Sequence, residues 1–154
     1  MDKPKAGFLR RTLALFLDMV ILDAAGVMVT YPLHAKYEVD LEGLLTSLLS
    51  GDMPDPSALM FLLLYSLLAT VLWGIYFTCF IGSNGQTPGK KFLRLRVERV
   101  DGNPMDFKTA FNRFVGYSIS GSFLFAGFFW ALFDKNKQTW HDKMAKTFVV
   151  KISS

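Results

Sequence analysis

The sequence predicts an all-α membrane protein: a small helical bundle of two full transmembrane helices plus a broken or re-entrant helical hairpin, with a small cytoplasmic antiparallel β-sheet. Only 19% of the 154 residues are charged, against about 25% in ordinary soluble domains. The charges avoid most of three segments, residues 12–33, 58–81 and 114–133. About 20 apolar residues cross the hydrocarbon core of a bilayer as a helix. Apolar and polar residues alternate over 92–100, as in a half-buried strand.

We expect one membrane domain over residues 1–154. Leucines at helical spacing predict an amphipathic helix between the first two apolar segments, and glycines interrupt the third segment. In chain order the expected elements are a helix over 8–33, an outer loop over 34–57 with an amphipathic helix at about 40–50, a helix over 58–81, a cytoplasmic turn and β-hairpin over 82–107, a helical hairpin or broken helix over 108–134, and a strand over 147–152.

The distribution of charge predicts the orientation of these elements. Basic side chains dominate residues 1–11 and 82–113, whereas acidic ones dominate residues 34–57. Cytoplasmic loops of membrane proteins carry an excess of Lys and Arg. We therefore expect the N-terminus and the 82–113 loop in the cytoplasm and the 34–57 loop outside.

The C-terminal tail decides between two paths for the third apolar segment. A single crossing would place the lysine-rich tail outside, whereas a hairpin would return it to the cytoplasm. Asp101 and Gly102 predict a hairpin turn after the strand at 92–100, and residues 147–152 read as a further strand. If the tail strand joins this hairpin, both lie on the same side of the membrane. This favours the return and two cytoplasmic termini.

Two aspartates interrupt the first apolar segment, Asp18 and Asp23. Each costs roughly 2.5 to 3.5 kcal/mol at the centre of a membrane helix. Intramembrane carboxylates commonly bind ions or relay protons. For Asp18 the structural alternative is an ion pair between helices, with Arg113 as the candidate partner. For Asp23 a hydrogen-bonded structural role or a protonated side chain is favoured.

Four stretches together resemble the RDD family of bacterial membrane proteins: RRTLALFLD, GQTPGKKFLRLRVERVDG, Arg113 within KTAFNRF, and HDKMAKTFVV. The resemblance covers nearly the whole chain and assigns the family's arginine and two aspartates to Arg11, Asp18 and Asp142. Asp23 is not part of the pattern. The resemblance implies a small multi-pass protein of the bacterial cytoplasmic (inner) membrane, for which ligand transport, including sodium/proton antiport, has been suggested.

The segment from Gly85 to Lys90 is not a phosphate-binding loop, because three residues separate its two glycines where such a loop has four, and Lys91 follows Lys90 where the loop has Ser or Thr. We expect a tight cytoplasmic turn whose lysines meet anionic headgroups. His141 and Asp142 point in different directions as neighbours, so Asp142 is expected to cap or brace the turn into the last strand. The candidate polar network comprises Asp18, Arg11, Arg113 and Asp142, with Asp23 and His141 secondary and Gly85, Thr87, Gly89 and Lys90 in the turn.

Two functions remain open at this point, with transport as the leading expectation and a scaffold as the alternative. One is a cation/proton transporter for a monovalent cation, in which two spans and a broken third require a homo-oligomer to enclose a pathway. The other is a non-transporting membrane scaffold or assembly partner with a structural Arg/Asp network, binding the lipid bilayer and an unidentified protein. We expect no enzymatic activity and no bound cofactor, metal or nucleic acid, because the sequence contains no recognisable motif for them.

Overall fold

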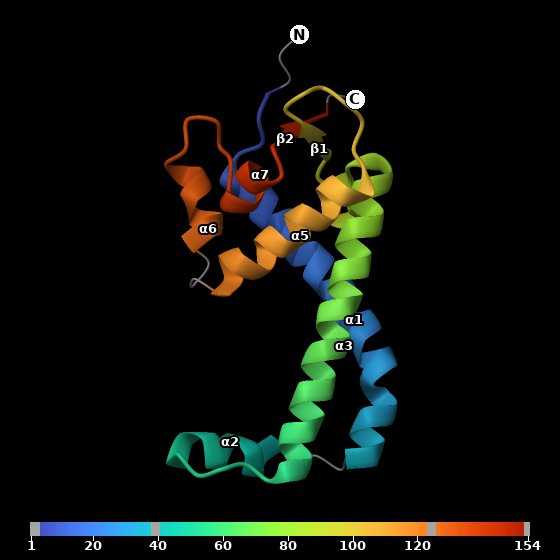
Figure 1. The fold of residues 1–154 in the computed structure, drawn as a ribbon, viewed down its shortest axis with the longest axis vertical. Coiled ribbons are helices and arrows are strands. Elements are labelled where there is room, and N and C mark those ends of the chain that lie inside the picture. Colours follow the sequence, from blue (N-terminus) through green and yellow to red (C-terminus); the bar gives the residue numbers. More distant parts are fainter. Residues whose placement is uncertain (1–3, 38–40, 123–125, 153–154) are drawn as a thin grey trace. The chain divides into compact units, whose positions relative to one another are not determined.

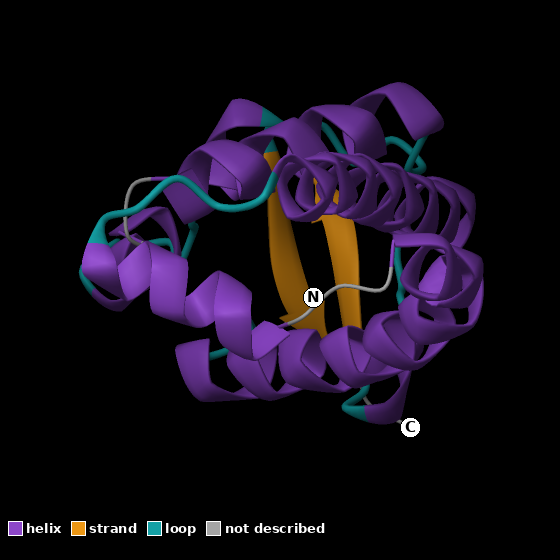
Figure 2. Cartoon of the chain, turned by 90° about the horizontal axis from the view of Figure 1, so that it is seen from below, coloured by secondary structure: helices purple, strands orange, loops and turns teal. Residues whose placement is uncertain are grey.

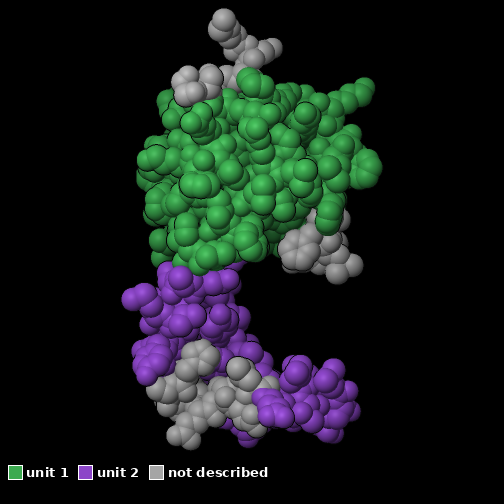
Figure 3. Space-filling view, turned by 180° about the vertical axis from the view of Figure 1, so that it is seen from behind, with its two compact units in different colours: residues 1–21, 74–154 green, residues 22–73 purple. Residues whose placement is uncertain are grey.

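The computed structural model describes residues 4–37, 41–122 and 126–152, and these are mostly helical (Figure 1). Two strands lie side by side among the helices and loops (Figure 2). The chain divides into two compact units, residues 1–21 with 74–154 and residues 22–73 (Figure 3). The elements are α1 Phe8–Tyr37, α2 Leu41–Ser50, α3 Pro56–Asn84, α4 Pro88–Phe92, β1 Leu95–Arg99, α5 Phe107–Ser122, α6 Ala126–Phe129, the 3-10 helix η1 Trp130–Leu132, α7 Trp140–Met144 and β2 Thr147–Lys151.

Two of the helices, α1 and α3, are long and apolar enough to cross a membrane. The qualifying parts are Phe8–Pro32 and Pro56–Asn84, and only 17% and 11% of their most apolar windows are buried inside the chain. A core helix of a soluble domain would bury most of that surface. Both helices are longer than predicted: α1 continues to Tyr37 instead of residue 33, and α3 runs from Pro56 to Asn84 instead of 58–81.

The unit formed by residues 22–73 contains the second part of α1, the helix α2 and the first part of α3. The helix α2 covers the predicted amphipathic segment except residue 40, which lies outside the described residues. The backbone N–H of Ser57 donates to the Asp55 carboxylate at 2.9 Å, which satisfies one of the unpaired donors at the start of α3.

The other unit contains the sheet. β1 and β2 pair antiparallel, from Leu95 opposite Lys151 to Arg99 opposite Thr147. Leu95 and Val97 are buried, as the alternation over 92–100 predicts, and Val149 and Val150 of β2 are buried as well. The N-terminal segment borders β2 as well, because the Ala6 N–H donates to the Val149 carbonyl at 2.8 Å.

The β-hairpin expected within 82–107 differs from the structure: β1 pairs with the C-terminal β2, and the described residues 101–106 form no strand. Pro104 has no N–H to donate to a ladder. Asp101 accepts hydrogen bonds from Arg99 and from the backbone N–H of Asn103, and Asp106 accepts one from the Thr109 N–H at the start of α5. These side chains stabilise a connection into a helix instead of a returning strand. The sheet therefore has two strands, not three.

The third apolar segment forms α5 and, after residues 123–125, α6 and η1. The break expected in the middle of this segment falls on residues 123–125, which lie outside the described residues. α6 packs back on α5, because the rings of Tyr117 and Phe128 stack with centroids 5.8 Å apart. The helix α7 also packs against α5 (Figure 1). The tail therefore returns to the sheet beside β1.

Candidate functional site

The carboxylate of Asp18 is fully buried in the unit of residues 1–21 and 74–154. Its Oδ1 accepts from the Tyr76 hydroxyl at 2.8 Å and from the Gly89 N–H at 2.8 Å. Its Oδ2 accepts from the Thr87 hydroxyl at 2.5 Å. Three donors from α3 and the start of α4 therefore compensate the loss of water around this charge.

The sequence GQTPGK builds the cradle for Asp18. Gly85 directly follows the last residue of α3 and adopts φ +73°, a conformation that favours glycine. Thr87 is the N-cap of α4 and accepts from the Lys90 N–H, and Pro88 occupies the first turn. A Cβ on Gly89 would overlap the Ala14 carbonyl oxygen and lie 2.8 Å from Asp18 Oδ1. Only glycine lets the α4 backbone approach the carboxylate this closely.

The sequence predicts both lysines of the turn at the surface, but Lys90 is buried. Its Nζ lies 3.9 Å from Asp18 Oδ2 and 5.5 Å above the centre of the Phe77 ring. The reason is the helical turn of α4, which directs Lys90 towards α1 and α3 while the neighbouring Lys91 is exposed.

The second buried carboxylate belongs to Asp142 in α7. Its Oδ1 accepts from Arg113 Nη1 at 2.6 Å, and its Oδ2 accepts from Arg11 Nη1 at 2.8 Å. Asp142 also forms a capping box with Thr139, so it braces the turn before the last strand as the sequence predicted. Burial alone disfavours the carboxylate, but the charges of Arg113 and Arg11 outweigh that effect and hold the pKa of Asp142 below its ordinary value.

Arg113 pairs with Asp142 and not with Asp18, which corrects the candidate ion pair. Its side chain is fully buried in α5 and also donates to the Thr147 hydroxyl, while its Nη2 lies 3.5 Å from the Tyr117 hydroxyl. The reason lies in the packing of the helices: α7 packs on α5 and presents Asp142 there, whereas α3 and the start of α4 supply the donors of Asp18. Arg11, which shares a helix with Asp18, likewise bonds to Asp142.

His141 is buried beside this pair. Its Nε2 lies 2.7 Å from the Thr139 hydroxyl, and its ring centre lies 4.1 Å from that of Tyr117. Burial lowers the pKa of His141 well below its ordinary 6.5, and the positive charges of Arg113 and Arg11 act in the same direction. The ring is therefore neutral at pH 7.

Asp23 belongs to the unit of residues 22–73 and not to this network. Its exposed side chain and Thr30 line a cavity of about 30 Å³. No hydrogen bond or ion pair joins Asp23 to another residue in the described part of the chain. The hydrogen-bonded structural role expected for it is thus not visible among these residues.

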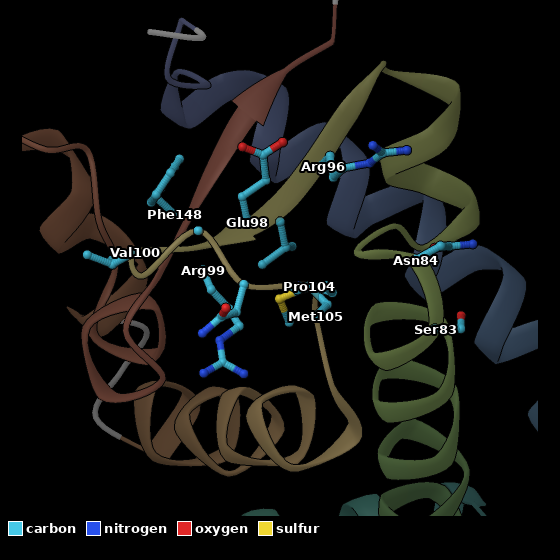
Figure 4. Close-up of a pocket in the computed structure, with 12 residues that line it drawn as sticks. Ser83, Asn84, Arg96, Glu98, Arg99, Val100, Pro104, Met105 and Phe148 are labelled. Carbon is cyan, nitrogen blue, oxygen red and sulfur yellow. The ribbon is translucent and has the colours of Figure 1, made fainter.

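Two larger cavities lie in the unit of residues 1–21 and 74–154. One of about 500 Å³ lies beside β1 and the connection that follows it, and Figure 4 shows Glu98 and Arg99 projecting from β1 in different directions there. Arg99 is already bonded to Asp101 and Asp106. The other, of about 300 Å³, reaches the polar network through Arg11, Lys90 and Arg113.

Sequence reasoning missed the partners that complete the network: Tyr76, Tyr117, Thr139 and Thr147. Thr139 had a readable signal, because Ser or Thr three residues before an acidic residue is the pattern of a capping box. Tyr76 and Thr147 carry none, since their partners Asp18 and Arg113 are 58 and 34 residues away in sequence. Tyr117 lies four residues after its partner Arg113 on α5, a helical spacing that sequence reasoning did not use. Among the described residues no group of three His, Cys, Asp or Glu side chains could hold a metal ion.

Comparison with known proteins identifies the family of this chain. The chain is 26% identical over 151 residues to the uncharacterized protein YxaI of Bacillus subtilis (strain 168). The aligned region covers 97% of this chain and 99% of that protein. No solved structure matches the chain. The model of the RDD family matches residues 5–146, a range that includes Arg11, Asp18, Arg113 and Asp142. The protein therefore belongs to the RDD family.

Proposed function

We propose that this RDD protein is a multi-pass scaffold or assembly partner of the bacterial inner membrane, with both termini in the cytoplasm and no transport activity. The helices α1 and α3 span the bilayer, and α5 with α6 forms a hairpin that does not cross. The length and apolar surface of α1 and α3 support the spans. The pairing of β2 with β1 supports the return of the tail.

The observation that carries the proposal is the saturation of both buried carboxylates. Asp18 holds three donors with Lys90 nearby, and Asp142 holds two guanidinium groups and the Thr139 N–H. A cation site needs oxygens with free lone pairs, and a proton relay needs a carboxylate that changes its protonation. Here the carboxylates join α1, α3, α4, α5 and α7, which is the role of a structural network.

The alternative is cation/proton exchange by a homo-oligomer. One observation favours it: Asp23 and Thr30 line a cavity with room for about one water molecule. In that mechanism Asp23 would bind the ion, and a second copy would close the pathway. The two functions differ in whether the isolated protein moves ions.

A flux measurement distinguishes them. Purified protein is reconstituted into liposomes with a pH-sensitive dye inside, and sodium, potassium and lithium gradients are applied in turn. We expect no proton flux above that of protein-free liposomes, and we expect retention in the membrane after alkaline carbonate extraction. Flux that Asp18→Asn or Asp23→Asn abolishes, in variants that melt like the wild type, would establish exchange and overturn the scaffold proposal.

A further inference from the structure

The cavity of about 300 Å³ has a cationic end and an apolar wall. Arg11, Lys90 and Arg113 line it together with neutral polar groups, and the apolar wall includes Leu15, Phe16 and Phe128. A site with both features matches an amphiphile that carries a negative group and a hydrocarbon chain.

Among the described residues, the charges around this cavity do not balance. Three cations, Arg11, Lys90 and Arg113, face two carboxylates, Asp18 and Asp142. His141 adds no charge at pH 7, because burial lowers its pKa well below 6.5. One positive charge is therefore in surplus, and a buried unpaired charge is costly unless an anion compensates it.

Donors are also left over at the same place. Arg11 Nε and Arg113 Nε are buried, and neither has a hydrogen-bond partner among the described residues. Arg113 is fully buried and lines the cavity. Guanidinium N–H groups suit the paired oxygens of a phosphate group. The surplus charge and these unpartnered donors belong to arginines that line the cavity, and both favour an oxyanion as its ligand.

The order of groups along α1 matches the order of groups in a lipid. At about 1.5 Å per residue, Arg11 lies about 4.5 Å and Leu15 about 10 Å from the start of the apolar part at Phe8. Arg11 therefore lies at the level of the lipid headgroups, and Leu15 and Phe16 lie at the level of the first part of the acyl chains. Thr12 and Phe16 are exposed, so the cavity opens on the surface that would face the bilayer.

We propose that this cavity binds one anionic phospholipid, with its phosphodiester among Arg11, Lys90 and Arg113 and an acyl chain along Leu15, Phe16 and Phe128. The inference rests on the membrane location proposed above and adds a ligand to the polar network. The bound lipid neutralises the surplus charge and ties the network to the inner-membrane surface.

Delipidated protein in a neutral detergent tests this by native mass spectrometry. The probes are phosphatidylglycerol, phosphatidylcholine with the same chains, oleate and glycerol 3-phosphate. We expect one phosphatidylglycerol per chain, bound at least about tenfold more tightly than each other probe, because only it combines one net negative charge on a phosphodiester with acyl chains. Equal binding of the two lipids overturns the proposal, and so does tighter binding of oleate or of glycerol 3-phosphate.

Variants at the cavity mouth give a second readout. Thr12 lines the cavity with an exposed side chain. Within the described parts of the chain its hydroxyl donates only to the Phe8 carbonyl of its own helix, so its substitution leaves the network intact. Thr12→Glu should weaken phosphatidylglycerol binding at least about tenfold through like-charge repulsion, whereas Thr12→Gln should not. Leu13→Glu places the same charge on the next residue, which is exposed and does not line the cavity, and should bind like the wild type.

The outcomes separate this inference from the proposed function. Equal affinities of Thr12→Glu and Thr12→Gln, with both variants melting like the wild type, would overturn the lipid site. If the wild type still resists carbonate extraction in that case, the membrane scaffold stands without a specific lipid. Extraction of the wild type by carbonate would overturn both.

Discussion

Arg113 and Asp142 lie 29 residues apart in sequence and form an ion pair at 2.6 Å in which neither side chain is exposed to solvent. The second oxygen of Asp142 binds Arg11, which lies 131 residues away in the chain. One carboxylate thereby joins α1, α5 and α7. Removal of one member would leave charges buried without compensation.

Asp142→Asn should destabilise the protein by about 3–5 kcal/mol, because it leaves two guanidinium groups facing a neutral amide. Thermal unfolding of the purified protein in detergent measures this. Asp101→Asn is the matched control, since it breaks an exposed ion pair with Arg99 and should change the melting temperature little. Equal melting temperatures for the two variants would show that the buried network does not stabilise the fold.

Gly89→Ala should destabilise the contact between α4 and α1. The added Cβ would collide with the Ala14 carbonyl and crowd Asp18, and such overpacking costs about 1–3 kcal/mol. Gly26→Ala is the matched control, because a Cβ at Gly26 meets nothing within 4 Å. Thermal unfolding should show a lower melting temperature for Gly89→Ala alone. A melting temperature for Gly89→Ala at or above that of the control would contradict this close approach.

Stability should fall as the pH drops below about 6.5. Burial lowers the pKa of His141 in the folded state, so the unfolded chain takes up this proton first and acidification favours unfolding. For one such group the slope is at most about 1.4 kcal/mol per pH unit. The low pKa of Asp142 adds a second loss only below its ordinary value of 3.8.

Melting temperatures between pH 7.5 and 5 test this assignment to His141. The wild type should lose stability over this interval, and His141→Gln should give a flatter profile, because glutamine does not titrate. Asp142 remains ionised in both proteins throughout the interval. Parallel profiles for the two proteins would place the titrating group elsewhere.

Reporters inserted at Gly102 and fused after Ser154 should both read cytoplasmic. Gly102 lies in an exposed turn directly after β1, and β1 pairs with β2 near the C-terminus. Strands that share a ladder lie on the same side of a membrane. A reporter at Gly51, within the acidic loop, should read external by the charge rule. Opposite readings at Gly102 and Ser154 would exclude the β1–β2 sheet in the membrane-bound protein.

The resemblance to the RDD family followed from four short stretches of sequence and is confirmed. The two apolar helices and the presence of a small antiparallel sheet were also predictable. Helix length, apolar composition and strand alternation are local properties, so the sequence near each element contains the required information. The bracing of the turn before the last strand by Asp142 was predictable for the same reason, because Asp142 lies next to that turn in the sequence.

Only the tertiary structure decided which partners the charged residues have. Asp18 bonds to Thr87 and Gly89, which lie 69 and 71 residues away, and not to Arg113. Lys90 is buried because α4 packs on α1, and β1 takes the C-terminal strand because residues 101–106 lead into α5. The residue types and their positions in apolar segments indicate which charged side chains need a partner. The packing of elements far apart in the chain determines which groups provide it.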